Sequence, residues 1–341
     1  MHRAPLAIAL VTVIVADSAL GRDAGRPVVL AARDSLDPAR DATADGRAML
    51  EDLAWEPVAF EVRLAAPAWP RRVTFPSPVP SGDRVNDRVT LEWFVARDAS
   101  GAPVPGPAVL LLHALDGQMV ATRAMAGYFA HNGIHAFAMH LPGYNSRRTA
   151  KSRPGLDSAV VLLRQAIVDA RRAADAIAAC PHVDGEHVGL VGTSLGGFIA
   201  SVTAAIDNRF APVFILLAGG DLENLLKQRM RDLPGLRRRM RQRGLTGSRL
   251  SRIVARVEPV RLAHRLDRRR TWLYSATRDR VVPPASARAL ASAARLDAEH
   301  HVWLEGNHVS VAVNLPWIVL RMTEEVRRTA ASGGPPTGPE L

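Results

Sequence analysis

The sequence predicts an α/β fold with a doubly wound, mostly parallel central sheet, antiparallel N-terminal strands and a small helical cap insertion. Short, wholly apolar runs alternate with segments of helical periodicity, which is typical of parallel strands joined by helices. Runs of strictly alternating apolar and polar residues precede them and indicate antiparallel strands. The chain has 341 residues, 48% of them hydrophobic, which is enough for a large buried core.

The antiparallel strands are predicted where apolar and polar residues alternate with a period of two. This alternation covers residues 60–64, 72–75 and 89–95. The proline-rich run at 76–80 predicts a turn or edge segment, because proline cannot donate a hydrogen bond to a central ladder.

The parallel part of the sheet is predicted from apolar runs, each followed by a helical pattern. The predicted strands are 108–113, 134–139, 188–191, 211–218, 271–276 and 301–304, and the predicted helices are 119–132, 156–179, 284–294 and 315–329, with a further helix beginning at Gly197.

The domain organisation is predicted from changes in composition along the chain. We expect a signal peptide at 1–21, a mobile leader at 22–55 with one short helix near 46–53, and the main domain at 56–331. Within that domain, helical stretches broken by Pro234-Gly235 and Gly244 predict the cap at about 221–270. Residues 332–341, which contain Gly-Gly-Pro-Pro, are expected to be disordered.

The N-terminus has the features of a secretory signal. A short basic start precedes the apolar run Leu6–Ala16, and small residues at Ala19 and Gly21 favour cleavage after Gly21. We therefore expect export to the periplasm or the extracellular space. An uncleaved anchor and an N-terminal strand are the alternatives, and no later segment is apolar enough to span a membrane.

The formal charge of +11 comes from one segment. Residues 227–270 contain 16 Lys plus Arg and 3 acids, and the rest of the chain is close to neutral. This basic cap has three interpretations: a solvated helical face, a collar that attracts anionic substrates, or a surface that contacts acidic lipid or another polyanion. No aromatic residue lies between Asp221 and Arg270, which argues against stacking on single-stranded nucleic acid. We expect no nucleic-acid partner.

Cys180 is the only cysteine, which excludes an intramolecular disulfide and any cysteine-based metal cluster. It lies at an element boundary beside Pro181, away from any basic partner, and is interpreted as a packing residue. No metal or organic cofactor is expected.

The candidate nucleophile lies in the stretch 188–198, which reads VGLVGTSLGGF. A buried strand turns there directly into a helix, with Ser194 at the apex of the pattern G-x-S-x-G. Gly192 and Gly196 are the small neighbours that allow so sharp a turn, and the backbone N–H of Leu195 is a candidate oxyanion donor. The alternative is a tight glycine-rich loop without chemistry.

The candidate acid and base follow two later strands. An activated serine needs an imidazole within hydrogen-bond reach and a carboxylate that orients the imidazole. Asp279 follows the strand 271–276 and His308 follows the strand 301–304, so both belong to the sheet edge that carries Ser194. Asp221 and Glu223 are alternative acids, or Asp279 is a capping or turn residue. His300 and His301 lie at the opposite end of their strand.

With these residues in view, the chain resembles the α/β-hydrolase-fold serine hydrolases over about residues 89–329. The order Ser194, Asp279, His308 is similar to the family order of nucleophile, acid and histidine. The stretch 113–117, HALDG, is similar to the His-Gly motif after the first central strand of the family. The resemblance implies an oxyanion donor at the N–H of Leu115, or of Ala114, which replaces the usual glycine.

The Asp-x-x-Val-Pro motif at Asp279 resembles dienelactone-hydrolase-like and peptidase-like esterases more than lipases. The expected activity is hydrolysis of a carboxylic ester by a Ser-His-Asp acyl-enzyme mechanism, acting on a small-molecule ester that is neutral or anionic. A serine peptidase or amidase uses the same residues. A catalytically silent binding protein of the same fold is the alternative of a different class.

Overall fold

The computed structural model describes residues 27–36, 40–115, 117–149 and 156–332. The predicted signal peptide and the part of the tail beyond Ser332 lie outside the described residues. Over the described ranges, no helix combines the length and the apolar character needed to cross a membrane.

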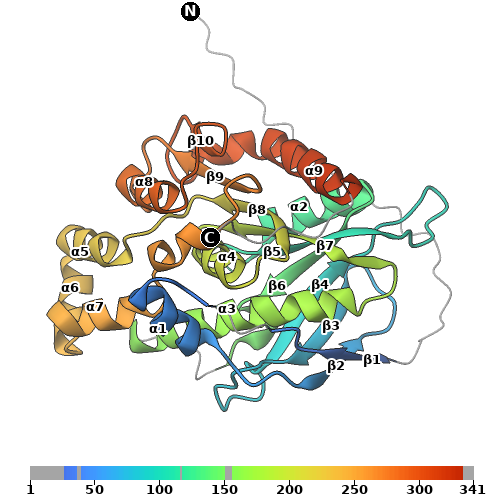
Figure 1. Ribbon diagram of the computed structural model, residues 1–341, viewed down its shortest axis with the longest axis horizontal. Helices are drawn as coiled ribbons and strands as arrows, with labels where there is room; N and C mark the ends of the chain where they lie inside the picture. The colour runs from blue at the N-terminus through green and yellow to red at the C-terminus, as the bar shows by residue number, and fades with distance from the viewer. Residues whose placement is uncertain (1–26, 37–39, 116, 150–155, 333–341) are drawn as a thin grey trace, which may run out of the picture.

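The centre of the fold is one mixed sheet, in which ten strands are described (Figure 1). Its order is β1-β2-β3-β4-β6-β5-β7-β8-β9-β10. In this order, neighbouring strands from β1 as far as β6 pair antiparallel. Neighbouring strands from β6 as far as β10 pair parallel. The strands are β1 Val28–Arg33, β2 Ala59–Leu64, β3 Arg71–Pro76, β4 Arg88–Phe94, β5 Gly106–Leu112, β6 His135–His140, β7 Val183–Thr193, β8 Phe210–Leu216, β9 Thr271–Ala276 and β10 His301–Leu304.

Helices cover both faces of the sheet, as the predicted doubly wound fold requires. One apolar core lies between the sheet and α1, α3, α4 and α8, and a second lies between the sheet and α2 and α9. The predicted fold class is therefore confirmed. These helices are α1 Ala44–Leu53, α2 Val120–His131, α3 Leu156–Ala178, α4 Leu195–Ile206, α8 Pro284–Ala293 and α9 Leu315–Ala331.

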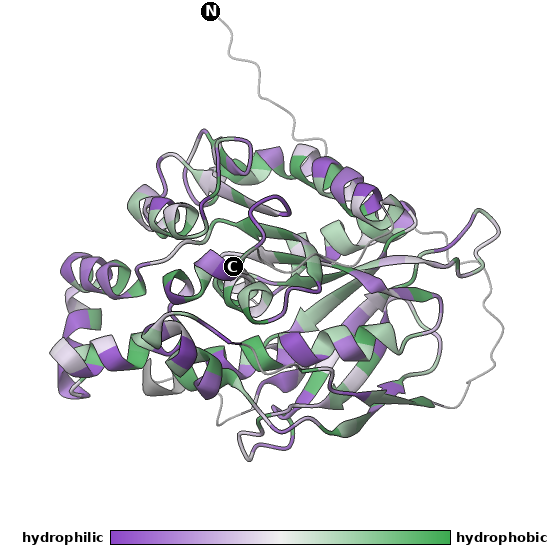
Figure 2. Cartoon of the chain, viewed as in Figure 1, coloured by the Kyte–Doolittle hydropathy of each residue, from purple (hydrophilic) through white to green (hydrophobic). Residues whose placement is uncertain are grey.

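A helical insertion separates β8 from β9. It consists of α5 Leu222–Asp232, α6 Pro234–Gln242 and α7 Gly247–Ala255, followed by two short 3-10 turns. These helices share a small apolar cluster of their own, built on Met240, Leu245, Leu250 and Val254. They lie together at one end of the molecule, and Figure 2 shows many hydrophilic residues on them.

Part of the segment expected to be a mobile leader belongs to the sheet, which corrects that prediction. Residues 28–33 form β1, which pairs along its whole length with β2. Asp34 then accepts hydrogen bonds from Nε and Nη2 of Arg172 on α3, at 2.8 and 2.5 Å, and both side chains are buried. The sequence pattern did not predict this strand, because Arg172, the residue that anchors it through Asp34, lies far along the chain. The short helix expected near 46–53 is present as α1.

Cys180 is buried just after α3. Burial raises the pKa of its thiol to about 12, so the thiol stays protonated and inert at neutral pH. This agrees with its interpretation as a packing residue.

Candidate active site

A sharp turn between β7 and α4 holds Ser194. The serine lies between Thr193, the last residue of β7, and Leu195, the first residue of α4, with φ 51° and ψ −110°. A positive φ is a strained backbone conformation for a residue with a side chain. Its backbone N–H donates to the carbonyl of Leu216 on β8 at 2.8 Å, which fixes the turn on the sheet.

The two glycines around Ser194 are required by close backbone approach. A Cβ atom on Gly192 would overlap the carbonyl oxygen of Gly196, and a Cβ atom on Gly196 would overlap the carbonyl oxygen of Leu112 on β5. The turn therefore has the geometry of a nucleophile elbow, in which strand and helix pack too tightly for any larger residue.

Ser194, His308 and Asp279 form a continuous hydrogen-bonded chain. The Oγ of Ser194 lies 3.1 Å from Nε2 of His308, and Nδ1 of His308 lies 2.6 Å from Oδ2 of Asp279. Asp279 is 5% exposed, and its other oxygen accepts the backbone N–H groups of Val281 and Val282 at 2.7 and 2.9 Å. The carboxylate is thus fixed by its own loop while it orients the imidazole.

The alternative acids have other partners. Asp221 accepts a hydrogen bond from the side chain of Asn224 at 2.7 Å, and Glu223 pairs with Lys227 at 2.6 Å. His300 and His301 contact Asp297 and Ser275, at the amino end of β10. The structure brings together only the three residues predicted as the triad.

A cavity of about 750 Å³ adjoins the elbow. Leu115 and Leu195, the predicted oxyanion residues, both line it, and Leu195 is the first residue of α4, where helix geometry leaves N–H groups without intrahelical partners. Its remaining walls are largely apolar, and Arg148 is the charged residue among those that line it. That the backbone N–H groups of Leu115 and Leu195 stabilise an oxyanion stays a prediction. Another hollow of about 520 Å³ lies around Asp297 and Trp303, away from the triad.

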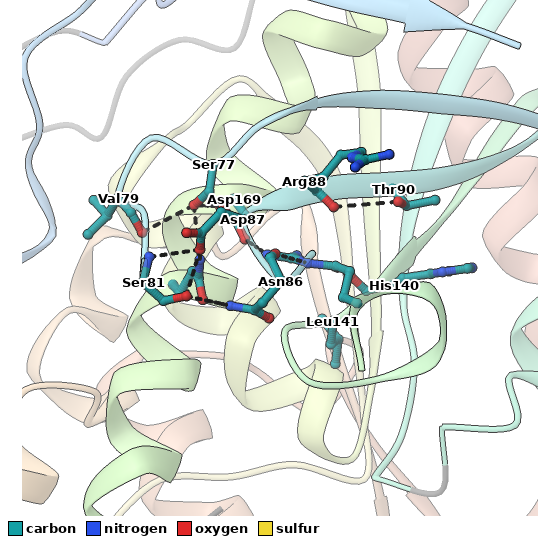
Figure 3. A network of polar contacts seen from close by, with 12 residues as sticks. Ser77, Val79, Ser81, Asn86, Asp87, Arg88, Thr90, His140, Leu141 and Asp169 are labelled. Atoms are coloured by element: carbon teal, nitrogen blue, oxygen red, sulfur yellow. Dashed lines mark hydrogen bonds and ion pairs between the residues drawn. The ribbon is translucent and has the colours of Figure 1, made fainter. Parts of the chain in front are cut away.

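A buried polar network holds the loop after β6, which forms one wall of this cavity. Arg147 is fully buried and donates to the carboxylate of Asp169 on α3 and to the backbone carbonyls of Asn86 and His140, at 2.7, 2.7 and 3.2 Å. Figure 3 shows Asp169 beside Ser77, whose hydroxyl donates to the other oxygen of this carboxylate at 2.5 Å. Sequence reasoning missed these residues, because a lone arginine and a helical aspartate carry no motif.

A second serine–histidine–carboxylate chain was also missed. The Oγ of Ser146 lies 2.7 Å from Nδ1 of His140, whose Nε2 lies 2.9 Å from Oε1 of Glu92. Arg123 donates to both oxygens of Glu92, each at 2.7 Å. Burial acts to raise the pKa of Glu92, but the hydrogen bonds from Arg123 and His140 outweigh it and lower the pKa to about 2.

Two features distinguish Ser194 from Ser146. Ser194 precedes the first turn of the long helix α4, whose N-terminus favours developing negative charge, whereas Ser146 lies inside a short 3-10 turn, Asn145–Arg147. Glu92 is also paired with the guanidinium of Arg123, whereas no described arginine or lysine pairs with Asp279, whose carboxylate faces His308. The geometry for activating a nucleophile therefore favours Ser194. Among the described residues, no group of three or more His, Cys, Asp or Glu side chains is placed to hold a metal ion.

Solved structures with the same fold include several hydrolases. The acetyl xylan esterase from Paenibacillus sp. R4 superposes with a TM-score of 0.63 at 15% identity, covering 86% of this chain and 96% of that one. Acetyl xylan esterase 1 from Thermoanaerobacterium sp. JW/SL YS485 gives 0.55 at 15% identity, over 78% and 84%. The alpha/beta hydrolase GrgF from Penicillium sp. sh18 gives 0.54 at 14% identity, over 76% and 98%.

No curated protein sequence matches the chain significantly. The family model described as alpha/beta hydrolase fold matches residues 107–306, which run from β5 to the loop before His308 and include Ser194 and Asp279. The chain therefore belongs to the alpha/beta hydrolase fold family.

Proposed function

We propose that the protein is a serine hydrolase that cleaves carboxylic esters through an acyl-enzyme. The observation that carries this proposal is the hydrogen-bonded chain from Ser194 through His308 to Asp279, with the serine on a strained elbow. The esterase neighbours of the same fold support an ester substrate, and the largely apolar cavity beside Leu195 suits an ester better than a charged peptide.

The proposed reaction has two halves. Nε2 of His308 accepts the proton of Ser194 as Oγ attacks the ester carbonyl, and the backbone N–H groups of Leu195 and Leu115 stabilise the oxyanion. His308 then donates that proton to the leaving alcohol, and the acyl group stays on Ser194. Water attacks the acyl-enzyme while His308 accepts its proton, and His308 then donates that proton to Oγ of Ser194 as the bond to the acyl group breaks and the acid leaves. Asp279 stabilises the imidazolium in both halves.

The decisive experiment is labelling of the protein with a fluorophosphonate probe. Wild type is expected to be labelled, and Ser194→Ala and His308→Ala to lose the label. Ser146→Ala is the matched control, because this serine also contacts a histidine but lies outside the elbow. Labelling that survives Ser194→Ala and disappears in Ser146→Ala would overturn the assignment.

A panel of p-nitrophenyl esters and p-nitroanilides then identifies the reaction. Turnover of the esters with little turnover of the anilides is the expected result. Preference for anilides would show an amidase or peptidase, and a folded protein that is neither labelled nor active would be a silent binding protein.

We also propose that the protein is exported, because the apolar run Leu6–Ala16 follows a basic start and precedes a small-residue cleavage sequence. N-terminal sequencing of the protein recovered after expression checks this. A chain that begins at Arg22 supports the proposal, and one that begins at Met1 contradicts it.

A further inference from the structure

Exposed aliphatic side chains surround the sheet edge that carries Ser194. Leu115 and Val120 flank the turn between β5 and α2 and are 65% and 68% exposed. Val309 and Val313 follow His308 after β10 and are 77% and 79% exposed. Single exposed apolar residues are common, but four of them on the two segments that follow β5 and β10 at the edge that carries the triad indicate a surface that meets an apolar environment.

The adjoining helical insertion presents unpaired positive charge. Nine arginines lie between Arg229 and Arg252 with one acid, Asp232, and eight of the nine are exposed. None of the nine forms an ion pair with a described residue, in contrast to Lys227 and Arg256, which pair with Glu223 and Asp52. The apolar side chains of α5–α7 pack inward on Met240 and Leu250, so the outward surface is mainly guanidinium groups.

The basic insertion borders the loop that carries Asp279. The insertion begins with α5, directly after the carboxyl end of β8, and β8 lies next to β7, which carries Ser194. Nη1 of Arg229 on α5 donates to the backbone carbonyl of Arg280, the residue after Asp279, at 3.4 Å. The insertion therefore starts at the same edge of the sheet as the loops that carry the four aliphatic side chains.

We propose that this edge docks onto an anionic phospholipid bilayer. The arginines of α5–α7 contact lipid phosphates, which match the planar guanidinium group, while Leu115, Val120, Val309 and Val313 enter the interfacial layer. The docking itself does not depend on catalysis. Its consequence, that esters in or on the bilayer reach Ser194 directly, rests on the proposed function.

A nucleic-acid partner fits these observations less well. A nucleic acid would neutralise the arginines but leave the four aliphatic side chains in water. The insertion contains no aromatic residue for stacking on bases, and the exposed Leu233 at the corner between α5 and α6 adds an apolar side chain to the basic surface.

The test is vesicle flotation with Ser194→Ala, which needs no turnover. Vesicles of phosphatidylcholine with phosphatidylglycerol are expected to bind the protein at low salt and to release it at high salt, and phosphatidylcholine alone to bind it weakly. The triple variant Arg238→Gln, Arg239→Gln, Arg241→Gln should lower the partition coefficient roughly 100-fold, at about fivefold for each arginine.

The matched control is Arg97→Gln, Arg295→Gln, Arg327→Gln, which removes the same net charge from the opposite edge of the sheet and should leave binding within about threefold of the parent. An equal loss of vesicle binding in the two triple variants would show general charge attraction and overturn the proposal. It is also overturned if the anionic vesicles fail to bind, or if duplex DNA binds more tightly than the vesicles do.

A separate double variant tests the contribution of the exposed aliphatic side chains. Val120→Ser with Val313→Ser should weaken vesicle binding several-fold and leave binding to soluble heparin unchanged, because only a bilayer offers an apolar layer. Unchanged vesicle binding would overturn the docking orientation. Ester hydrolysis by the wild type in solution is measured separately, so failure of docking and failure of the proposed function are distinguishable.

Discussion

At the scale of single residues, the orientation of His308 depends on one carboxylate. Asp279 is the acidic group within hydrogen-bond distance of Nδ1, and two backbone N–H groups fix its position. An amide at this position would donate to Nδ1 and favour the tautomer that cannot accept the proton of Ser194.

We therefore expect Asp279→Asn to lower kcat by roughly four orders of magnitude with little change in KM. Asp221→Asn is the control, because Asp221 contacts Asn224 and not the imidazole. Steady-state kinetics on a p-nitrophenyl ester measures both variants. The assignment of the acid fails if Asp279→Asn keeps normal activity and Asp221→Asn does not.

Glycine at 196 is a second single-residue requirement. Gly196→Ala should destabilise the protein by about 3 kcal/mol or prevent folding, because the added Cβ overlaps the backbone of β5. Gly127→Ala is the control, since a Cβ there meets nothing within 4 Å and alanine favours the helix α2 by about 1 kcal/mol. Thermal unfolding compares the two, and similar melting temperatures would contradict the packing argument.

At the scale of elements, residues 141–148, which follow β6, form a wall of the cavity and are held by buried contacts. Arg147 joins this loop to α3 through Asp169, and to the turn before β4 through the carbonyl of Asn86. Gly143 in the same loop donates to the side chain of Asn86 at 2.9 Å. The shape of the cavity thus depends on an ion pair whose two residues do not line it.

Asp169→Asn should reduce the free energy of unfolding by about 3–5 kcal/mol, because it leaves the buried guanidinium of Arg147 without its counter-charge. Glu61→Gln is the control, since it breaks an ion pair with Arg63 that is about 60% exposed on both sides and should cost at most about 1 kcal/mol. Urea unfolding at neutral pH measures both. Equal shifts in the two variants would show that the buried pair has no special role.

At the scale of the whole molecule, acid stability depends on carboxylates whose pKa folding lowers. Glu92 is one such carboxylate: its pKa falls from 4.5 to about 2 because Arg123 and His140 donate hydrogen bonds to it. A lowered folded pKa means that the stabilisation is complete above pH 4.5 and is lost as the pH falls toward 2. It amounts to roughly 3 kcal/mol at most.

Glu92→Gln should therefore be less stable than wild type at neutral pH, and the difference should shrink as the pH falls from 4.5 to 2. Glu324→Gln on the exposed side of α9 serves as the control and should follow the wild-type curve. Denaturant unfolding at a series of pH values gives both curves. A constant difference between Glu92→Gln and wild type across this range would rule out the linkage.

The sequence by itself determined the sheet from β2 to β10, the helices that cover it and the three residues of the candidate triad. Gly192-x-Ser194-x-Gly196 is a local pattern, and the carboxyl ends of parallel strands always share one edge, so the positions of Asp279 and His308 after their strands were sufficient. These features are predictable because the serine motif is local in sequence and the topology of a parallel sheet fixes where each strand ends.

The tertiary structure alone decided the features that join distant segments. Arg172 anchors the strand β1, and the pair of Arg147 with Asp169 holds the cavity wall. Glu92 and His140 form part of the second serine–histidine–carboxylate chain. Each of these side chains has no local pattern, because its partner lies on another element and the two meet only when those elements come together in the fold. A buried charge is stable only beside a partner of opposite charge or a hydrogen-bonding group. The roles of such residues can therefore be identified only in the folded structure.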